Sequence, residues 1–207
     1  MAHKHSDVNA AIAPVSPSLA DGRLLLRPWR DEDAPELFAV VRESVASVGR
    51  WLPWCNADYG LAQAEAWTGQ CREHWRSGEQ FAFAVRDAAS GELLGGCGLN
   101  QLNHPHRSAN LGYWVRGARH GQGIAVAAAR LTARFAFVEL GLIRIEIVTM
   151  LDNHASRRVA TKLGASFECV ARQRLWALDR AHDAAVYALI PADLDQPAAA
   201  QIAAMSS

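Results

Sequence analysis

The sequence has no excess charge of either sign, since its 207 residues include 21 Lys and Arg and 21 Asp and Glu. A protein without net charge has little long-range electrostatic attraction for nucleic acid or for an anionic membrane, so neither is expected as a direct partner. Any anionic ligand would have to be held by a local site.

Cysteine is scarce and widely spaced. The four thiols belong to Cys55, Cys71, Cys97 and Cys169. No two of them form a Cys-x-x-Cys pair, which argues against a zinc cluster and against a disulfide framework. No metal site is therefore expected, and reduced thiols are consistent with a cytoplasmic protein.

Long apolar runs are absent as well. No stretch approaches the roughly 20 residues that cross a bilayer, and the N-terminus lacks the apolar core of a signal peptide, so a soluble protein is expected. Hydrophobic residues make up 50% of the chain, enough to bury one compact core over residues 23–194. The flanking segments, 1–22 and 195–207, are rich in Ala, Pro and Ser and are expected to be flexible arms.

Between these arms, the apolar periodicity alternates between that of strands and that of helices. Strands are predicted at 23–29, 79–87, 107–116, 143–150, 166–175 and 184–190, with a further strand after a turn at Ser90-Gly91. Helices are predicted after a cap at Asp31 or Asp33, at 61–78, over about 17 residues from 124, and at 155–164. Several of the strands follow one another as hairpins, which disfavours a doubly wound nucleotide-binding fold.

The most informative local motif is the run His120-Gly121-Gln122-Gly123-Ile124-Ala125, at the start of a long apolar segment. Glycine is costly inside a helix, but just before one it allows a tight turn and leaves the free N–H groups of the helix N-terminus open to a phosphate. A tight strand-to-helix turn with no ligand is the alternative. No Lys-Ser or Lys-Thr follows, and Val126 interrupts the three-glycine pattern, so ATP and dinucleotides are disfavoured.

A second motif lies in LDNHASRRVATKLG, residues 151–164. Asn153 is predicted to cap a helix, with Ser156 in its first turn and Gly164 at its end. The two motifs in this order resemble the GNAT superfamily of N-acetyltransferases, and more closely its RimJ/RimL group of ribosomal-protein serine/alanine N-acetyltransferases. That group also shows the segments RLLLRPW, WLPW and GYWV found here, so the resemblance spans about residues 23–192.

The resemblance implies an α+β GNAT fold in a single domain. Its central sheet is mixed but mostly antiparallel, twisted, flanked by helices, and splayed between its fourth and fifth strands. The strands NLGYWV and IRIEIVT would diverge at that point. The pantetheine arm of acetyl-CoA would then pair with the exposed strand edge like an extra strand.

Acetyl-CoA is the implied cofactor, with CoA as its product. His120 stands where the family has Gln or Arg, but main-chain N–H groups are the main ligands of the pyrophosphate. The residues implied in cofactor binding are Trp114, Val115, His120, Gly121, Gln122, Gly123, Ile124, Ala125, Asn153, Ser156 and Arg157. Trp51, Trp54 and Tyr59 would form part of the acceptor wall, with ordinary core packing as the alternative for each.

Acetyl transfer needs a neutral amine, a polarised carbonyl and a proton for the departing thiolate. Ser156 is the expected proton donor. The alternative is that Ser156 only satisfies backbone N–H groups at the helix start, and that water or Tyr113 protonates the thiolate. The resemblance also places strand amides from Tyr113 to Val115 where they can polarise the carbonyl.

The proton acceptor is less well defined. Asn110 stands where many relatives carry Glu, and Asn cannot act as a base. Glu146 would then serve through a water, although it can equally be a paired strand carboxylate. His104 and His106 are further candidates that can equally be exposed loop residues.

Three functions stay open. The first is acetyl transfer to the α-amine of a protein or peptide N-terminus, by direct attack in a ternary complex. The second is the same chemistry on a small amine such as an amino acid, a polyamine or an antibiotic, and the third is a non-catalytic domain that binds acetyl-CoA and regulates a partner. The missing carboxylate favours the first, because an α-amine has a pKa of about 8 and a lysine amine about 10.4. A homodimer is a further expectation, since relatives often form one and seven Trp residues would allow an apolar patch.

Overall fold

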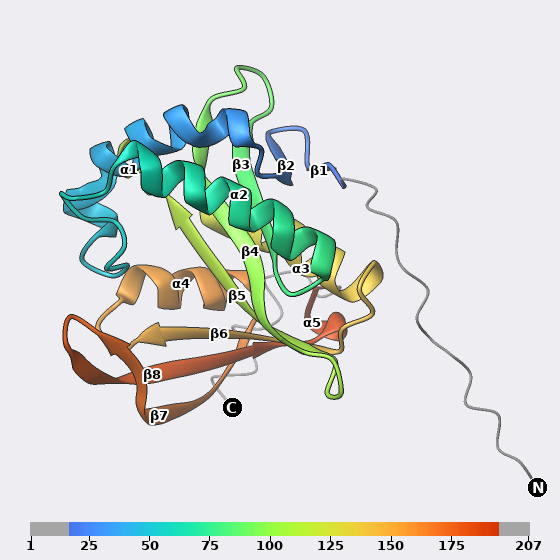
Figure 1. Ribbon diagram of the computed structural model, residues 1–207. Helices are drawn as coiled ribbons and strands as arrows, with labels where there is room; N and C mark the ends of the chain where they lie inside the picture. Colours follow the sequence, from blue (N-terminus) through green and yellow to red (C-terminus); the bar gives the residue numbers. More distant parts are fainter. Residues whose placement is uncertain (1–16, 195–207) are drawn as a thin grey trace, which may run out of the picture.

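The computed structural model describes residues 17–194, and its elements are shown in Figure 1. The strands are β1 (Leu19–Ala20), β2 (Leu24–Pro28), β3 (Phe81–Asp87), β4 (Leu93–Asn103), β5 (Ser108–Val115), β6 (Arg144–Met150), β7 (Ser166–Ala177) and β8 (Arg180–Leu189). The α-helices are α1 (Ala34–Val48), α2 (Leu61–Ser77), α3 (Ile124–Val138), α4 (His154–Leu163) and α5 (Pro191–Leu194), and two short 3-10 helices, η1 (Asp31–Asp33) and η2 (Gly117–Arg119), precede α1 and α3.

The strands form one sheet in the order β1-β2-β3-β4-β5-β6-β8-β7. All neighbouring strands are antiparallel except β5 and β6, which are parallel. The predicted mixed, mostly antiparallel sheet with flanking helices is thus confirmed. The sheet begins at Leu19, inside the segment for which an arm is expected; residues 1–16 and 195–207, the rest of the two expected arms, lie outside the described residues.

The sheet opens between β5 and β6. Their register covers only three pairs, from Ser108 with Arg144 to Asn110 with Glu146. Beyond Asn110, β5 continues to Val115 paired with β4, and β6 continues to Met150 paired with β8. The two strands visibly diverge in Figure 1, which leaves one edge of β5 without a strand partner over its last five residues. Because β1 adds a strand at the edge, the predicted opening falls between the fifth and sixth strands of the observed sheet.

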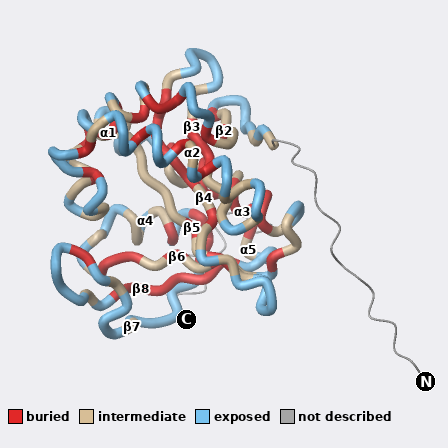
Figure 2. Tube along the Cα trace, in the orientation of Figure 1, coloured by how far each residue is buried: buried red, intermediate tan, exposed pale blue. Residues whose placement is uncertain are grey.

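Alternation along the strands buries apolar side chains on both faces of the sheet. On one face, Leu24, Leu26 and Phe83 pack in a core that includes the inner side of α3. On the other face, Trp29 and Ala84 pack with residues of α1 and α2. Figure 2 shows these buried segments along the central strands, whereas the edge strand β7 is mostly exposed. This two-sided packing fixes the strands that flank the opening.

The prediction that Asp33 caps the first α-helix is wrong. Asp33 stands at the N-cap of α1, where its carboxylate makes no capping bond; its carboxylate accepts a hydrogen bond from the Arg30 amide at 2.9 Å, in the capping box of η1. Asp33 is only 2% exposed and also accepts hydrogen bonds from Arg27 at 2.6 and 2.7 Å and from Arg86 at 2.7 Å. Burial by itself would raise the pKa of Asp33, but the bonds from Arg27 and the Arg30 amide, with the charges of Arg27 and Arg86, hold it below its usual value.

Among residues 17–194, no helix combines the length and the apolarity needed to cross a membrane.

Candidate active site

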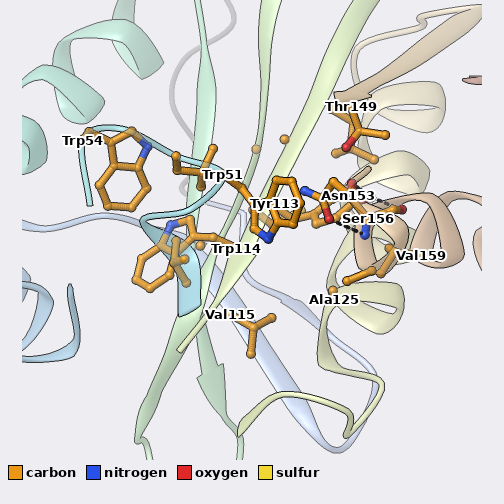
Figure 3. Close-up of a pocket in the computed structure, with 18 of the residues that line it drawn as sticks. Trp51, Trp54, Tyr113, Trp114, Val115, Ala125, Thr149, Asn153, Ser156 and Val159 are labelled. Atoms are coloured by element: carbon orange, nitrogen blue, oxygen red, sulfur yellow. Dashed lines mark hydrogen bonds between the residues drawn. The ribbon is translucent and has the colours of Figure 1, made fainter. Parts of the chain in front are cut away.

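A cavity of about 1290 Å³ follows the opening between β5 and β6. Its wall runs from the segment between α1 and α2, across β4 and β5, to the N-termini of α3 and α4. Figure 3 shows this arrangement, with Trp51 and Trp54 at one side and Asn153, Ser156 and Val159 at the other. The cavity thus joins both sequence motifs in one space.

The glycine motif forms the turn that leads into α3. Gly121 and Gly123 have φ of +77° and +76°, in the left-handed region that L side chains rarely adopt. Neither glycine has a heavy atom within 4 Å of the position of an added Cβ, so backbone conformation, not lack of space, requires glycine here. Gly123 is the N-cap of α3 and lines the cavity with Ile124 and Ala125. The free N–H groups of this first helical turn are available to an anion.

His120 turns back toward the sheet. Its Nε2 lies 2.8 Å from the carbonyl oxygen of Val115, at the end of β5. The ring therefore closes the loop onto the strand, and His120, Gly121 and Gln122 all lie in the cavity wall.

An ion-pair cluster holds the segment before the glycine loop. Arg116 pairs with Glu43 on α1 and with Glu92 at 2.7 Å, and Arg119 also pairs with Glu92. The Gly117 amide donates to Ser44 Oγ at 3.1 Å. Sequence reasoning missed these contacts, because the partners lie far apart in the chain and no local pattern connects them.

The second motif places Asn153 and Ser156 beside Tyr113. Asn153 Oδ1 accepts a hydrogen bond from the Ser156 amide at 3.0 Å, so the predicted cap of α4 is confirmed. The phenol oxygen of Tyr113 lies 3.1 Å from Ser156 Oγ and donates to the Ser156 carbonyl oxygen at 3.1 Å. Either hydroxyl can be the donor between the two side chains. Burial raises the pKa of Tyr113, so the phenol stays protonated at neutral pH.

The cap allows a direct prediction. Replacing Asn153 by alanine is expected to lower the free energy of unfolding by about 1 kcal/mol, because the Ser156 amide loses its acceptor. Affinity for CoA should fall as well, since Asn153 lines the cavity. Urea unfolding with and without CoA separates the two effects, and His154→Ala, an exposed position in the same turn, is the matched control. A change in stability with unaltered CoA affinity would leave Asn153 only its capping role.

Two of the sequence-predicted site residues lie outside the cavity wall. Glu146 accepts hydrogen bonds from Arg144 at 2.9 and 3.2 Å, and Arg144 also pairs with Glu168 at 2.6 Å. Arg157 donates to Tyr187 Oη and to the Leu151 carbonyl, both at 3.2 Å.

Two other basic residues of α4 line the cavity instead of Arg157. They are Arg158 and Lys162, which lie one helical turn apart. The residues expected at the strand end, Tyr113, Trp114 and Val115, line it as well. His104 and His106 are exposed in the turn between β4 and β5 and are not part of the wall.

Asn110 lies at the closed end of the opening. Its Nδ2 donates to Asn100 Oδ1 at 2.9 Å, and both side chains line the cavity. Asn110 is the register partner of Glu146 on β6. Paired residues of a ladder share one face of the sheet, so the side chain of Glu146 leaves the sheet on the same face as that of Asn110, although it is not part of the cavity wall.

The far side of the cavity is aromatic and neutral. Trp54 contacts Trp114 edge to face, with ring centroids 5.6 Å apart. It also contacts the buried Tyr59, with ring centroids 6.2 Å apart. Trp67 and Trp176 also line the cavity, and Trp176, on the exposed strand β7, was not predicted. Side-chain amides supply many of the polar groups here, from Asn56, Gln63, Gln70, Gln80, Asn100 and Asn110.

Comparison with known proteins identifies the family. Residues 23–166 match the family model described as "Acetyltransferase (GNAT) domain". A Bacillus subtilis protein, YdaF, provisionally named a ribosomal N-acetyltransferase, is 29% identical over 171 residues, covering 81% of this chain and 91% of its own.

Solved structures agree with this match. A Vibrio cholerae protein, provisionally described as a ribosomal-protein-serine acetyltransferase, is 28% identical with a TM-score of 0.76, over 84% of this chain and 98% of its own. Mycobacterium smegmatis RimJ, in complex with CoA-disulfide, is 26% identical with a TM-score of 0.73, over 93% of this chain and 96% of its own. The GNAT fold predicted from the motifs is therefore confirmed, and the chain belongs to the GNAT acetyltransferase family.

Proposed function

We propose that the protein transfers an acetyl group from acetyl-CoA to the α-amine of a protein or peptide N-terminus, by direct attack in a ternary complex. The observation that carries this proposal is the meeting of Tyr113 and Ser156 at 3.1 Å beside the open edge of β5, in a cavity whose far wall is neutral.

The residues present fit the cofactor. Gly121 and Gly123 shape a loop with free amides at the N-terminus of α3, which suits a pyrophosphate. The unpaired edge of β5, at Trp114 and Val115, suits an extended pantetheine arm. The M. smegmatis RimJ structure supports CoA as the ligand, because that relative is in complex with CoA-disulfide. When bound, acetyl-CoA would supply the acetyl thioester.

The chain's own groups handle the protons. Ser156 Oγ would donate a proton to the departing sulfur and would regain one through its hydrogen bond with Tyr113 Oη, whose phenol burial keeps protonated and which would in turn be reprotonated from water. Main-chain amides between Tyr113 and Val115 would polarise the carbonyl. Glu146 lies outside the cavity wall and is paired with Arg144, so we propose that the proton of the amine reaches it through a water; Glu146 is the register partner of Asn110, which lines the cavity.

The neutral wall favours one class of acceptor. An α-amine with a pKa of about 8 is partly neutral at pH 7, so it needs less help from a base than a lysine side chain does. A polyamine would be attracted by carboxylates, whereas the wall offers indoles and side-chain amides such as Asn56, Gln63 and Gln70. An N-terminal segment with uncharged first residues matches these surfaces better.

A panel of acceptors tests the proposal. Release of the CoA thiol is measured with a peptide that begins with serine or alanine, with its N-formylated form, and with spermidine. We expect the free peptide to react at least about tenfold faster than the other two, because only its amine is both unblocked and of low pKa. Faster reaction with spermidine would favour the small-amine function. Binding of acetyl-CoA without transfer to any acceptor would favour a regulatory domain.

A further inference from the structure

A second, smaller cavity of about 460 Å³ lies next to the glycine loop. It is bordered by α3, by the last turn of α4 and by the turn between β1 and β2. Gly123, Val126 and Lys162 line both cavities. A ligand that passes the N-terminus of α3 can therefore continue from the first cavity into the second.

The second cavity is strongly basic. Its wall holds the cationic side chains of Arg23, Arg130, Arg134 and Lys162, against the single carboxylate of Asp21. The sequence as a whole is neutral, with 21 basic and 21 acidic residues, so this excess is local. Four cations around about 460 Å³ create a positive potential that favours a compact polyanion.

The one carboxylate is already engaged by the main chain. Asp21 Oδ1 accepts hydrogen bonds from the amides of Arg23 at 2.9 Å and Leu24 at 2.7 Å. No ion pair joins Asp21 to any of the four cations among the described contacts of the chain. Asp21 therefore fixes the turn that presents Arg23.

Two of the four cationic side chains donate hydrogen bonds to main-chain carbonyls, and the other two do not. Arg23 Nη2 donates to the Gln122 carbonyl at 2.9 Å, which ties it to the glycine loop, and Arg130 donates to the Leu163 carbonyl at 3.4 Å. Within residues 17–194, no hydrogen bond or ion pair is found for the side chains of Arg134 and Lys162, both of which are exposed. Arg130 and Arg134 are one helical turn apart, so they project from the same side of α3.

We infer that the second cavity binds the 3′-phosphate of CoA and makes the protein select CoA over dephospho-CoA. This inference rests on the proposed function. A phosphate monoester carries about −1.5 to −2 charges at pH 7 and three acceptor oxygens, which matches guanidinium and ammonium donors. In CoA this group lies one ribose away from the pyrophosphate, and the basic cavity begins at Gly123, where the pyrophosphate would lie.

The two anionic groups of the ligand would thus be recognised by different means. The amides of the glycine loop would take the pyrophosphate, whose charge is spread over two phosphates. The side chains of Arg134 and Lys162 would take the monoester, which the loop amides do not reach. Removal of the monoester should then weaken binding without altering the reacting end of the molecule.

Titration calorimetry with CoA and dephospho-CoA at fixed ionic strength tests this inference without an acceptor. We expect dephospho-CoA to bind at least about tenfold more weakly, as the loss of charge-assisted hydrogen bonds implies. Arg134→Ala and Lys162→Ala should weaken CoA binding severalfold and leave dephospho-CoA binding unchanged, so that the selectivity falls. Arg172→Ala, at an exposed position of β7 outside both cavities, is the charge-matched control and should preserve the selectivity.

The outcomes separate the two proposals. Equal affinity of the wild-type protein for CoA and dephospho-CoA would overturn the phosphate assignment alone. Equal loss of affinity for both compounds in Arg134→Ala and Lys162→Ala would do the same. Binding of neither compound to the wild-type protein would overturn the proposed function and this inference with it.

Discussion

Replacing Ser156 by alanine is expected to lower kcat by at least about tenfold, because general-acid assistance typically contributes about 10²-fold to 10⁴-fold to the rate. The affinity for acetyl-CoA should change little, because the hydroxyl contributes most when negative charge builds on the departing sulfur. The physical basis is the position of Ser156 Oγ, which lies 3.1 Å from Tyr113 Oη at the first turn of α4. Steady-state rates of thiol release at saturating acceptor measure kcat, and calorimetry measures the affinity.

Two further variants make this prediction specific. Thr161→Ala also removes a hydroxyl from α4, but that hydroxyl donates to the Arg157 carbonyl at 3.1 Å and lies outside the cavity wall, so kcat should not change. Tyr113→Phe removes the group that orients Ser156 and should lower kcat less than Ser156→Ala does. Normal kcat in Ser156→Ala, with only a lower melting temperature, would show that Ser156 is structural. A large loss in Tyr113→Phe would then assign the proton to Tyr113.

Replacing Gly123 by valine is expected to abolish most of the stabilisation that CoA gives the protein. At a ligand concentration about 100-fold above Kd, binding should raise the free energy of unfolding by about 2.7 kcal/mol. Gly123 has a φ of +76°, which a β-branched residue adopts only at high cost, so the loop and the first amides of α3 must change conformation. The melting temperature with and without CoA reports the loss.

Gly78→Val is the matched control for this loss. Gly78 caps the C-terminus of α2 with a φ of +74°, has open space around an added Cβ, and is not part of the cavity wall. The backbone cost should be similar at both positions, but Gly78→Val should keep the stabilisation by CoA. A folded Gly123→Val protein with unaltered affinity for CoA would remove the main support for the anion site.

Local patterns predicted the parts of the fold that depend on neighbouring residues. Apolar alternation at 79–87 and a β-branched run at 143–150 predicted the strands found at Phe81–Asp87 and Arg144–Met150, and the Asn153 cap followed from residue type and spacing alone. Asp33 shows the limit of such reasoning. Its residue type favours an N-cap, but its carboxylate accepts hydrogen bonds from Arg27 and from Arg86, and Arg86 lies on another strand. That long-range ion pair leaves no periodic signal in the sequence.

The candidate site shows the same division. The glycine loop and Ser156 were recognised from motifs, but the contact of Ser156 with Tyr113, 43 positions apart, requires the fold. Helical phase decides which of two adjacent arginines faces the cavity, and the structure selects Arg158 over Arg157. The basic cavity joins the turn after β1 to α3 and α4, so no single segment reveals it. The homodimer and the cytoplasmic location stay predictions.

The central claim is acetyl transfer to an N-terminal α-amine, and mass spectrometry of one peptide tests it most directly. The peptide begins with serine or alanine, contains one lysine, and is incubated with the protein and acetyl-CoA. The account predicts the addition of one acetyl group, which fragmentation locates on the N-terminal nitrogen and which Gly123→Val does not produce. Acetylation of the lysine alone, or an unmodified peptide under conditions in which spermidine is acetylated, would contradict it.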